Sequence, residues 1–288
     1  MEKRITGHTE LIGLVATPIR HSKSPTMHNA AFRELGLDYA YLAFDVSREN
    51  IEDAIKGMKA LDVRGWNVSM PYKSQMLEYV DQMTPVAKLC GAINTVINDH
   101  GKLTGTITDG TGYMRALKEE GVDIIGKKIT IVGAGGAATA ICMQAAIDGV
   151  KEIAIFNRDD EFYPRAKQNV QKILEHTQCI AHVHHLEDLK TLKQQIDESV
   201  LFINATNVGM GELEGQMVLP HIDYLHQGIL VSDVIYMPEQ TELLKQAKNK
   251  GLRTFNGLGM MLYQGAEAFQ LWTGQQMPID AVKKALNI

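Results

Sequence analysis

Lys73 and Asp109 are the side chains of this sequence whose types best suit proton transfer. Lys73 closes the segment Asn67-Val68-Ser69-Met70-Pro71-Tyr72-Lys73. If Pro71 is the first residue of a helix, Lys73 lies in the first turn, where the helix dipole disfavours a cation. A nearby carboxylate would offset that cost, and Asp109 is the candidate, each group then shifting the pKa of the other. The simpler interpretation is a lysine that bends into solvent and an aspartate that caps the helix after it.

A second group of polar residues, Ser22 and Ser24, lies just before Pro25. The pattern predicts a helix with Ser24 as its N-cap and Pro25 as its first helical residue. Two hydroxyls, the N–H groups of the first turn and the helix dipole would together bind a carboxylate. Alternatively, Ser24 only caps its helix and Ser22 is a loop residue.

A glycine-rich turn predicts a dinucleotide site in the second half of the chain. Gly133, Gly135 and Ala138 fit the fingerprint G-x-G-x-x-G/A, between a predicted strand over 128–132 and a predicted helix that runs through Asp148. The first glycine makes the tight turn, and the second lets backbone N–H groups approach a pyrophosphate. The small third residue lets helix and strand pack closely. The alternative is a tight turn that binds no ligand.

The residues after the next predicted strand, 151–156, bear on the choice of cofactor. They read Asn157-Arg158-Asp159-Asp160. An acid here would accept hydrogen bonds from the adenosine ribose and repel a 2′-phosphate, whereas an arginine would attract that phosphate. Two carboxylates against one guanidinium favour NAD, with NADP as the second choice. The alternative is a solvated charged turn.

Strand-like and helix-like patterns alternate along most of the chain, which is typical of an α/β fold. The first part predicts strands over 11–15, 39–46, 66–70 and 93–97, helices from Ser24, over 49–61 and from Pro71, and a hairpin turn at Asp99-His100-Gly101. From residue 128 the alternation is more regular and predicts a parallel sheet with helices on both faces. We therefore expect an N-terminal α/β substrate domain (1–112), a Rossmann dinucleotide-binding domain (113–257) and C-terminal helices (258–288) that return to the first domain.

Composition excludes several classes of protein. The chain has 288 residues, with 29 Lys plus Arg and 34 Asp plus Glu, a formal charge of −5 and no basic run. This argues against a nucleic-acid binder and against a membrane-surface protein. No apolar run is long enough to span a bilayer, and the start at Met1–Arg4 leads into no signal-peptide core. Three widely spaced cysteines predict neither disulfides nor a metal site, so we expect a cytoplasmic protein.

Taken in order, the motifs resemble those of the shikimate/quinate dehydrogenase family, and the match covers nearly the whole chain. The matching pieces are S-x-S-P at 22–25, N-V-S-x-P-x-K at 67–73, G-A-I-N-T at 91–95, T-D-G at 108–110, G-A-G-G-A at 133–137, N-R at 157–158, N-A-T-x-V-G-M at 204–210, D-x-x-Y at 233–236 and G-x-G-M-x-x-x-Q-G at 257–265. Each piece is weak alone, but their shared order makes the resemblance specific.

The resemblance implies reversible reduction of 3-dehydroshikimate to shikimate with a nicotinamide cofactor, and for some members oxidation of quinate. It implies that Lys73 is the catalytic lysine and Asp109 its acidic partner. Ser22 and Ser24 would hold the substrate carboxylate. Further substrate-binding roles are implied for Asn67, Ser69, Asn94, Tyr236 and Gln264. Together with the arguments above, it assigns cofactor binding to Gly133, Ala134, Gly135, Gly136, Ala137, Asn157, Arg158, Asp160, Asn207, Val234, Met237 and Gly257.

Two positions depart from the family pattern. Ile107 stands where an asparagine is usual, so an amide is lost beside Asp109. Asp159 stands where NADP-using members usually carry threonine, which looks like the quinate/shikimate branch, where an acid favours NAD. Two other functions stay open: an NAD-binding regulatory protein, and a dehydrogenase of a related small hydroxy acid. The retained Lys73 and Asp109 argue against the first, and a homodimer is the candidate assembly.

Overall fold

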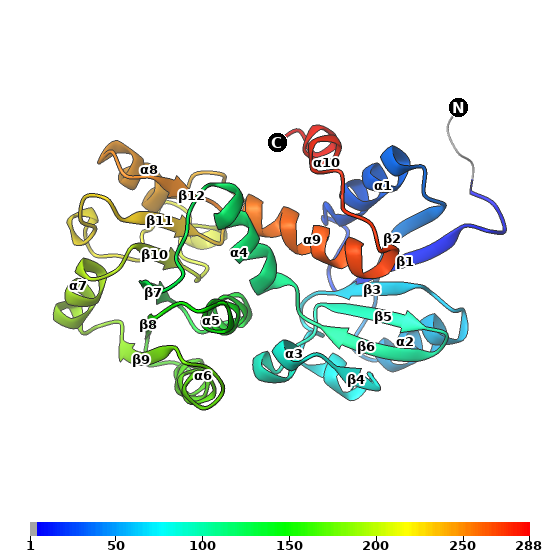
Figure 1. The fold of residues 1–288 in the computed structure, drawn as a ribbon, viewed down its shortest axis with the longest axis horizontal. Coiled ribbons are helices and arrows are strands. Elements are labelled where there is room, and N and C mark those ends of the chain that lie inside the picture. The colour runs from blue at the N-terminus through cyan, green and yellow to red at the C-terminus, as the bar shows by residue number, and fades with distance from the viewer. Residues whose placement is uncertain (1–4) are drawn as a thin grey trace. The chain divides into compact units, whose positions relative to one another are not determined.

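The computed structural model describes residues 5–288, so the start at Met1–Arg4, where we expect no signal peptide, lies outside the described residues. The chain forms two compact units (Figure 1). Unit 1 contains the residues up to Thr108 together with Gln264–Ile288, and unit 2 contains Asp109–Tyr263. No helix among residues 5–288 is long and apolar enough to cross a membrane.

Unit 1 is built on a six-stranded mixed sheet with the order β2-β1-β3-β5-β6-β4. Its elements are β1 (Glu10–Ala16), α1 (Ser24–Leu35), β2 (Tyr39–Asp45), α2 (Ile51–Ala60), β3 (Gly65–Val68), β4 (Gln82–Met83), α3 (Pro85–Cys90), β5 (Thr95–Asp99) and β6 (Lys102–Thr106). Helix α9 (Leu258–Thr273) brings the chain back into this unit, and α10 (Ile279–Leu286) packs against α1 (Figure 1).

Strand directions in unit 1 gather several polar segments at one edge of its sheet. β1 and β3 run parallel, so their carboxyl ends lie at the same edge. β5 runs antiparallel to β3, and β6 antiparallel to β5, so the start of β5 and the end of β6 also lie there. The segments that follow β1 and β3, precede β5 and follow β6 contain most of the polar residues singled out from the sequence.

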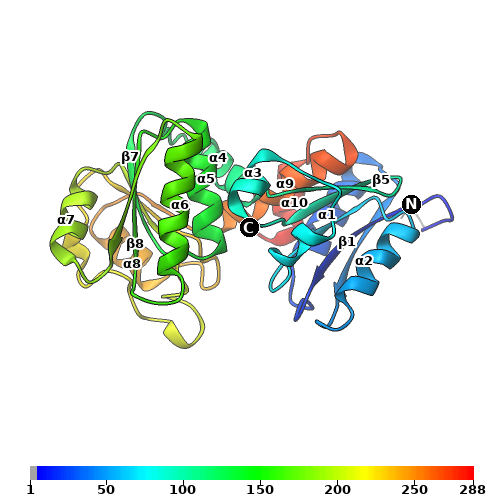
Figure 2. The ribbon, with the colours of Figure 1, turned by 90° about the horizontal axis from the view of Figure 1, so that it is seen from below.

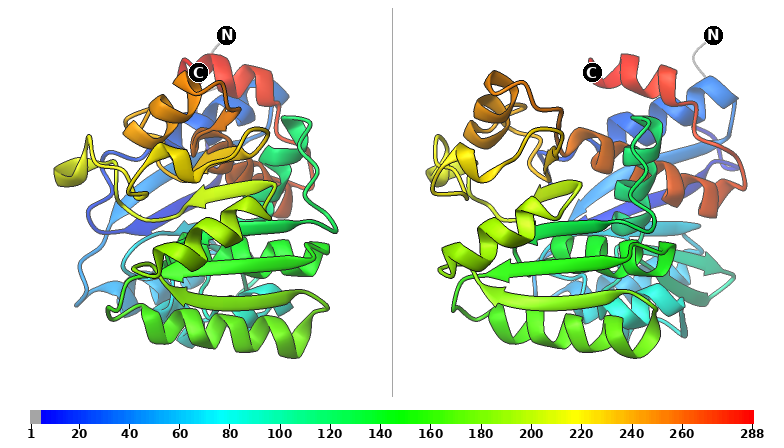
Figure 3. Two further views of the ribbon diagram at one scale, coloured as in Figure 1. Left: turned by 90° about the vertical axis from the view of Figure 1, so that its left-hand side faces the viewer. Right: turned by 60° about the vertical axis from the view of Figure 1, so that its left-hand side comes forward.

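Unit 2 is a doubly wound parallel sheet with the order β12-β11-β10-β7-β8-β9. Its elements are α4 (Asp109–Glu119), β7 (Lys128–Val132), α5 (Gly136–Asp148), β8 (Glu152–Asn157), α6 (Tyr163–His176), β9 (Ile180–His185), α7 (Leu189–Asp197), β10 (Leu201–Asn204), β11 (Leu230–Asp233), α8 (Glu242–Asn249) and β12 (Thr254–Phe255). Figure 2 shows α5 and α6 side by side, and Figure 3 shows the strands as neighbouring parallel arrows.

Buried apolar strands explain why unit 2 folds as the sequence predicts. The last four residues of β7 and all four residues of β10 and β11 are buried, the pattern of strands covered on both faces. One hydrophobic cluster, which includes Phe156, Phe202 and Val231, joins β8, β10 and β11 to α7 and α8. Along the chain, β8 and β9 are added on one side of β7, and β10, β11 and β12 on the other. The switch point of the sheet therefore lies between β7 and β10, and ligands of such sheets bind at this point.

The structure confirms the predicted α/β class, the Rossmann sheet and the C-terminal helices that join unit 1. It also confirms the hairpin turn between β5 and β6, where His100 and Gly101 both have positive φ. The helix predicted to open at Pro71 is wrong: residues 71–74 form turns, followed by a short 3₁₀ helix over Gln75–Glu78.

Candidate active site

The loop after β1 places both predicted serines at the start of α1. The helix begins at Ser24 with Lys23 as the N-cap, so the prediction that Ser24 is the N-cap is wrong by one residue. No side chain caps the helix as an N-cap residue does; instead the Ser22 Oγ accepts a hydrogen bond from the Ser24 N–H at 3.2 Å. Burial raises the pKa of Tyr41, and the Ser24 side chain partly offsets that rise.

Lys73 is half-buried in the turn that follows β3. The Lys73 carbonyl accepts a hydrogen bond from the Ile93 N–H at 2.8 Å, so this backbone is fastened to the segment before β5 and does not continue as a helix. The expectation that Lys73 opposes a helix dipole is therefore wrong. Ser69 lies in the same turn and donates its backbone N–H to the Val15 carbonyl at 3.0 Å, which fixes the turn against the end of β1.

The amide of Asn94 is held in one orientation by its neighbours in unit 1. Its Oδ1 accepts hydrogen bonds from the Thr95 hydroxyl at 2.8 Å and from the Thr108 N–H at 2.9 Å. Its Nδ2 therefore faces the Thr108 Oγ1 at 3.1 Å and the Gln264 Oε1 at 3.5 Å. The structure thus brings Asn94 and Gln264 together, although 170 residues separate them in the sequence.

Asp109 is the first residue of α4 and is buried, with 8% of its surface exposed. Its neighbour Thr108 is fastened to Asn94, and its other neighbour, Gly110, packs so closely that an added Cβ would overlap the Ala140 carbonyl oxygen. Ile107 is buried as well, so the position where the family usually carries an amide contributes an apolar side chain to the core. The backbone around Asp109 is thereby fixed from both sides.

The glycine turn of unit 2 contains one glycine that the fold requires, Gly133, and two that it does not require, Gly135 and Gly136. Gly133 has φ +115°, and an added Cβ would lie 2.7 Å from the Ala205 carbonyl oxygen, so the fold itself requires glycine there. Gly135 has φ −68°, and an added Cβ at Gly135 or Gly136 would meet no protein atom within 4 Å. Open space above backbone N–H groups at the start of α5 is what a pyrophosphate needs, so the residues present fit a dinucleotide.

The loop after β8 is closed by Asp160. Its Oδ1 accepts hydrogen bonds from the Asn157 side-chain amide at 2.8 Å and from the Phe162 N–H at 2.9 Å. Its Oδ2 lies 3.6 Å from the Arg158 guanidinium, and the Arg158 side chain is 68% exposed. Asp160 therefore shapes the loop and also sets the charge beside Arg158.

Two further loops at the carboxyl edge of this sheet are fastened by a buried aspartate, Asp233. Its carboxylate accepts hydrogen bonds from Asn204 at 3.0 Å, Thr241 at 2.9 Å and the Ile235 N–H at 2.9 Å. Burial raises the pKa of Asp233, and these three donors partly offset the rise. The loops that it joins carry four of the predicted site residues: Asn207, Val234, Tyr236 and Met237. Gly257 also lies here, because an added Cβ would overlap the Val234 carbonyl oxygen.

Replacing Asp233 with alanine is expected to lower the free energy of unfolding by about 3 kcal/mol, since three buried donors lose their acceptor. Thermal unfolding followed by circular dichroism would measure this. Asp223→Ala is the control, because Asp223 is 77% exposed and its ion pair with Lys250 contributes little. Equal unfolding temperatures for the two variants would contradict this role of Asp233.

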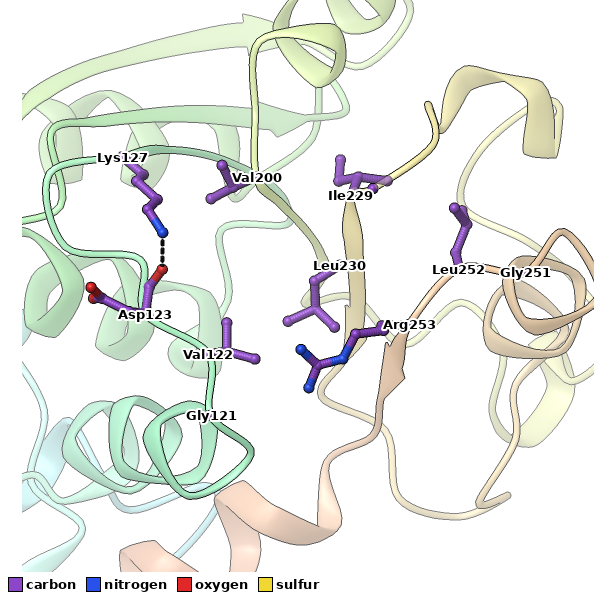
Figure 4. Close-up of a pocket in the computed structure, with 11 residues that line it drawn as sticks. Gly121, Val122, Asp123, Lys127, Val200, Ile229, Leu230, Gly251, Leu252 and Arg253 are labelled. Carbon is purple, nitrogen blue, oxygen red and sulfur yellow. Dashed lines mark hydrogen bonds between the residues drawn. The ribbon is translucent and has the colours of Figure 1, made fainter.

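A hollow of about 390 Å³ lies at the opposite, amino edge of the unit 2 sheet (Figure 4). Aliphatic side chains such as Val122, Val200 and Leu230 line it, together with the charged residues Asp123, Lys127 and Arg253. Lys127 donates to the Asp123 carbonyl at 2.7 Å and Arg253 to the Glu120 carbonyl at 2.9 Å, so both side chains bind backbone carbonyls of the segment just after α4. In parallel sheets ligands bind at the carboxyl edge, and this hollow is not the candidate site. Within residues 5–288, no three His, Cys, Asp or Glu side chains lie close enough to hold a metal.

The predicted site residues fall into two sets, one in each unit. Unit 1 contains Ser22, Ser24, Asn67, Ser69, Lys73, Asn94 and Gln264. Hydrogen bonds connect Ser22 to Ser24 and Asn94 to Gln264. Unit 2 contains Asp109, Tyr236 and the predicted cofactor residues. Sequence reasoning gave no role to Tyr41, Thr95 and Thr108, which hold the predicted residues. Thr95 and Thr108 lie in two of the family motifs, and the alternating pattern of 39–46 placed Tyr41 in a strand but gave no sign of its partners.

A parallel sheet with an open glycine turn at its switch point places the protein in the class of proteins with a Rossmann domain that fits a dinucleotide. The comparisons with known proteins are more specific. The family model described as the shikimate dehydrogenase substrate binding domain matches residues 14–96, and that of the shikimate 5′-dehydrogenase C-terminal domain matches residues 257–286.

Full-length relatives extend this match. A shikimate dehydrogenase (NADP(+)) of Listeria monocytogenes serotype 4b (strain F2365) is 60% identical over 99% of this chain and 98% of its own length. A quinate/shikimate dehydrogenase of Escherichia coli O17:K52:H18 (strain UMN026 / ExPEC) is 48% identical over 98% of each chain. The crystal structure of the shikimate 5-dehydrogenase of Listeria monocytogenes in complex with shikimate and NAD is 59% identical, with a TM-score of 0.97 over 99% of each chain. The chain belongs to the shikimate dehydrogenase family.

Proposed function

We propose that this protein catalyses the reversible reduction of 3-dehydroshikimate to shikimate with a nicotinamide dinucleotide, and that quinate is the second acid to test as a substrate. The observation that carries the proposal is the full-length match to a structure that contains shikimate and NAD, at a TM-score of 0.97. The name of the Escherichia coli relative is the reason to include quinate.

The proposal assigns substrate recognition mainly to unit 1. Ser22 and Ser24, at the start of α1, would bind the substrate carboxylate with Tyr236 of unit 2. Ser69, Asn94 and Gln264 would bind ring hydroxyls together with Asp109. The fixed amide of Asn94 supports this role, because a fixed donor and acceptor discriminate between hydroxyl positions on a ring.

Proton transfer is assigned to Lys73 and Asp109. The dinucleotide, when bound, supplies or accepts the hydride. In reduction, the Lys73 ammonium would give its proton to the oxygen that becomes the hydroxyl; in oxidation, the neutral amine would take that proton back. Asp109 would orient the lysine and accept a hydrogen bond from the substrate. Groups that hold a substrate in the reacting geometry contribute to the rate by positioning as well as by chemistry.

An assay of dinucleotide reduction with shikimate and with quinate, each with NAD and with NADP, tests the proposed function. Turnover of shikimate is the expected result. Dinucleotide binding without turnover of either acid would favour an NAD-binding regulatory protein. Turnover of a different small hydroxy acid alone would assign the chain to another substrate.

For the cofactor, we propose that NAD is favoured and NADP is accepted. Asp159 and Asp160 outnumber Arg158 in the loop after β8, and the Asp160 carboxylate lies close to the Arg158 guanidinium, which weakens its attraction for a 2′-phosphate. The relatives support the use of either dinucleotide: one Listeria monocytogenes protein is named for NADP(+), and a Listeria monocytogenes crystal structure contains NAD.

Asp160→Ala is expected to raise the KM for NAD about 10-fold, the effect of about 1.4 kcal/mol from lost hydrogen bonds to the ribose. Asp160→Asn is the matched variant, because it keeps an acceptor for the Phe162 N–H but removes the charge. We expect Asp160→Asn to improve the use of NADP relative to NAD. Steady-state kinetics with both dinucleotides measures this, and an unchanged KM for NAD in both variants would remove Asp160 from the ribose site.

A homodimer and a cytoplasmic location stay predictions from the sequence. Analytical ultracentrifugation tests the first, and fractionation of cells that express the protein tests the second.

A further inference from the structure

A chain of buried hydrogen bonds runs through unit 1 and begins at Tyr41, a residue of the edge strand β2. The Tyr41 hydroxyl donates to the Asn67 Oδ1 at 2.7 Å. The Asn67 Nδ2 donates to the Thr95 Oγ1 at 3.1 Å, and the Thr95 hydroxyl donates to the Asn94 Oδ1 at 2.8 Å. The chain therefore connects Tyr41 and Asn67 to Asn94, a residue to which the proposal gives a role in substrate recognition.

The amide of Asn67 is occupied by these internal partners. Besides Thr95, its Nδ2 donates to the Asn94 carbonyl at 3.1 Å, so both of its N–H bonds are directed at protein acceptors. Its Oδ1 accepts from Tyr41, and only 6% of Asn67 is exposed. All partners of the Asn67 amide are structural groups, so it acts on a ligand through the groups that it holds. The Asn94 amide differs, because its Nδ2 has a more distant second acceptor, the Gln264 Oε1 at 3.5 Å, and the proposal assigns Gln264 to the substrate as well.

Tyr41 is itself fixed at three points. Its backbone N–H and carbonyl pair with the side-chain amide of Asn29 in α1, both at 2.9 Å. Its ring stacks on the ring of His28, also in α1, with centroids 4.4 Å apart. Tyr41 is 0% exposed, and burial raises its pKa, so the hydroxyl keeps its proton and stays a donor. A donor held this firmly fixes the acceptor that it faces.

We infer that Tyr41 and Asn67 are positioning residues, which set the orientation of the Asn94 amide for a polyhydroxylated cyclic acid. The inference rests on the proposed function, because it concerns recognition of that substrate. The two residues act through side chains that they hold, since Tyr41 has no exposed surface and Asn67 has no unused N–H. The chain of donors also runs in one direction, from Tyr41 through Asn67 and Thr95 to Asn94, and such chains strengthen each member.

Tyr41→Phe and Thr95→Val break this chain at different places and keep the shapes of the side chains. Tyr41→Phe removes one bond of the chain, and Thr95→Val removes the two that the Thr95 hydroxyl makes. Each variant is expected to raise the KM for shikimate at least about 10-fold, the effect of losing one buried hydrogen bond, and to leave the KM for the dinucleotide within about twofold. The split between the two KM values separates positioning from a general loss of stability. Thr95→Val also tests the inference if Tyr41→Phe fails to fold. Tyr39→Phe is the matched control, since Tyr39 lies on the same strand but interacts with Glu10 and Arg64.

Asn67→Asp gives a signature that lost stability alone would not produce. The ionised carboxylate has no donor for the Asn94 carbonyl or the Thr95 Oγ1, whereas the protonated acid has one. We expect the KM of this variant for shikimate, divided by that of the wild type, to fall as the pH is lowered.

The outcomes distinguish this inference from the proposed function. Wild-type protein that turns over neither acid overturns both. Wild-type turnover of shikimate, with an unchanged KM for shikimate in the folded Tyr41→Phe and Thr95→Val variants, overturns the inference and leaves the proposed function intact. A KM for the dinucleotide that rises as much as the KM for shikimate also overturns it.

Discussion

Lys73→Ala is expected to lower kcat for shikimate oxidation by at least about 100-fold, the lower end of the effects of general acid–base groups. The proposed role of Lys73 is exercised as the proton moves, so its loss removes stabilisation of the transition state more than of bound substrate. The KM for shikimate should therefore change much less than kcat. Steady-state kinetics at saturating dinucleotide, with circular dichroism to show that the variant is folded, gives both values.

Two variants control this result. Lys88→Ala removes an exposed lysine from α3, another element of unit 1, and should leave kcat unchanged. Lys73→Arg keeps the positive charge but replaces the amine with a group that does not lose its proton at ordinary pH, so it should also be strongly impaired. Near-normal turnover in Lys73→Arg would reduce the role of Lys73 to electrostatics, and near-normal turnover in Lys73→Ala would refute it.

The sequence predicted unit 2 well because its elements follow from local patterns. The strand expected over 128–132 is β7, and the helix expected to run through Asp148 is α5, which ends there. Apolar runs bounded by turns are the primary signal for buried parallel strands, and the glycine fingerprint located the turn between β7 and α5.

The sequence predicted the turn at Lys73 badly because a distant partner decides it. Proline at the start of a helix is a good local rule, but the Lys73 carbonyl bonds to the Ile93 N–H, twenty residues away in the chain. The same limit explains why Tyr41 was missed. Its hydroxyl meets Asn67, which is 26 residues away, and no spacing rule for strands or helices connects the two. Long-range hydrogen bonds to buried amides leave no periodic signal.

The resemblance to the family predicted residues that physical reasoning alone did not reach. Gln264 lies in a helix of the returning segment, where spacing and composition give no reason to expect a ligand contact. In the structure its side chain lies 3.5 Å from the Nδ2 of Asn94. Asp233 differs from Gln264, because its role became clear only in the structure. The motif D-x-x-Y contains it without assigning it a role, and the structure gives it three buried hydrogen bonds that fasten loops.

Gly135→Val is expected to raise the KM for the dinucleotide about 100-fold and to leave the fold intact. An added Cβ at this position meets no protein atom within 4 Å, and φ −68° suits any residue, so the protein itself does not require glycine here. The proposed pyrophosphate does require glycine here, because a side chain would hold the pyrophosphate away from the backbone N–H groups at the start of α5. Losing two hydrogen bonds to a charged group, at about 1.5 kcal/mol each, corresponds to about 100-fold.

Valine is a poor N-cap for α5, so a fall of about 1 kcal/mol in the free energy of unfolding is expected with this variant. Gly57→Ala is the control, since Gly57 lies in α2 of unit 1 and also has open space where its Cβ would be. Gly133→Ala provides the contrast: its positive φ and the contact with Ala205 make it a variant that loses stability as well as binding. Isothermal titration with NAD measures the binding. A folded Gly135→Val variant with wild-type affinity for NAD would show that the open turn is not the pyrophosphate site.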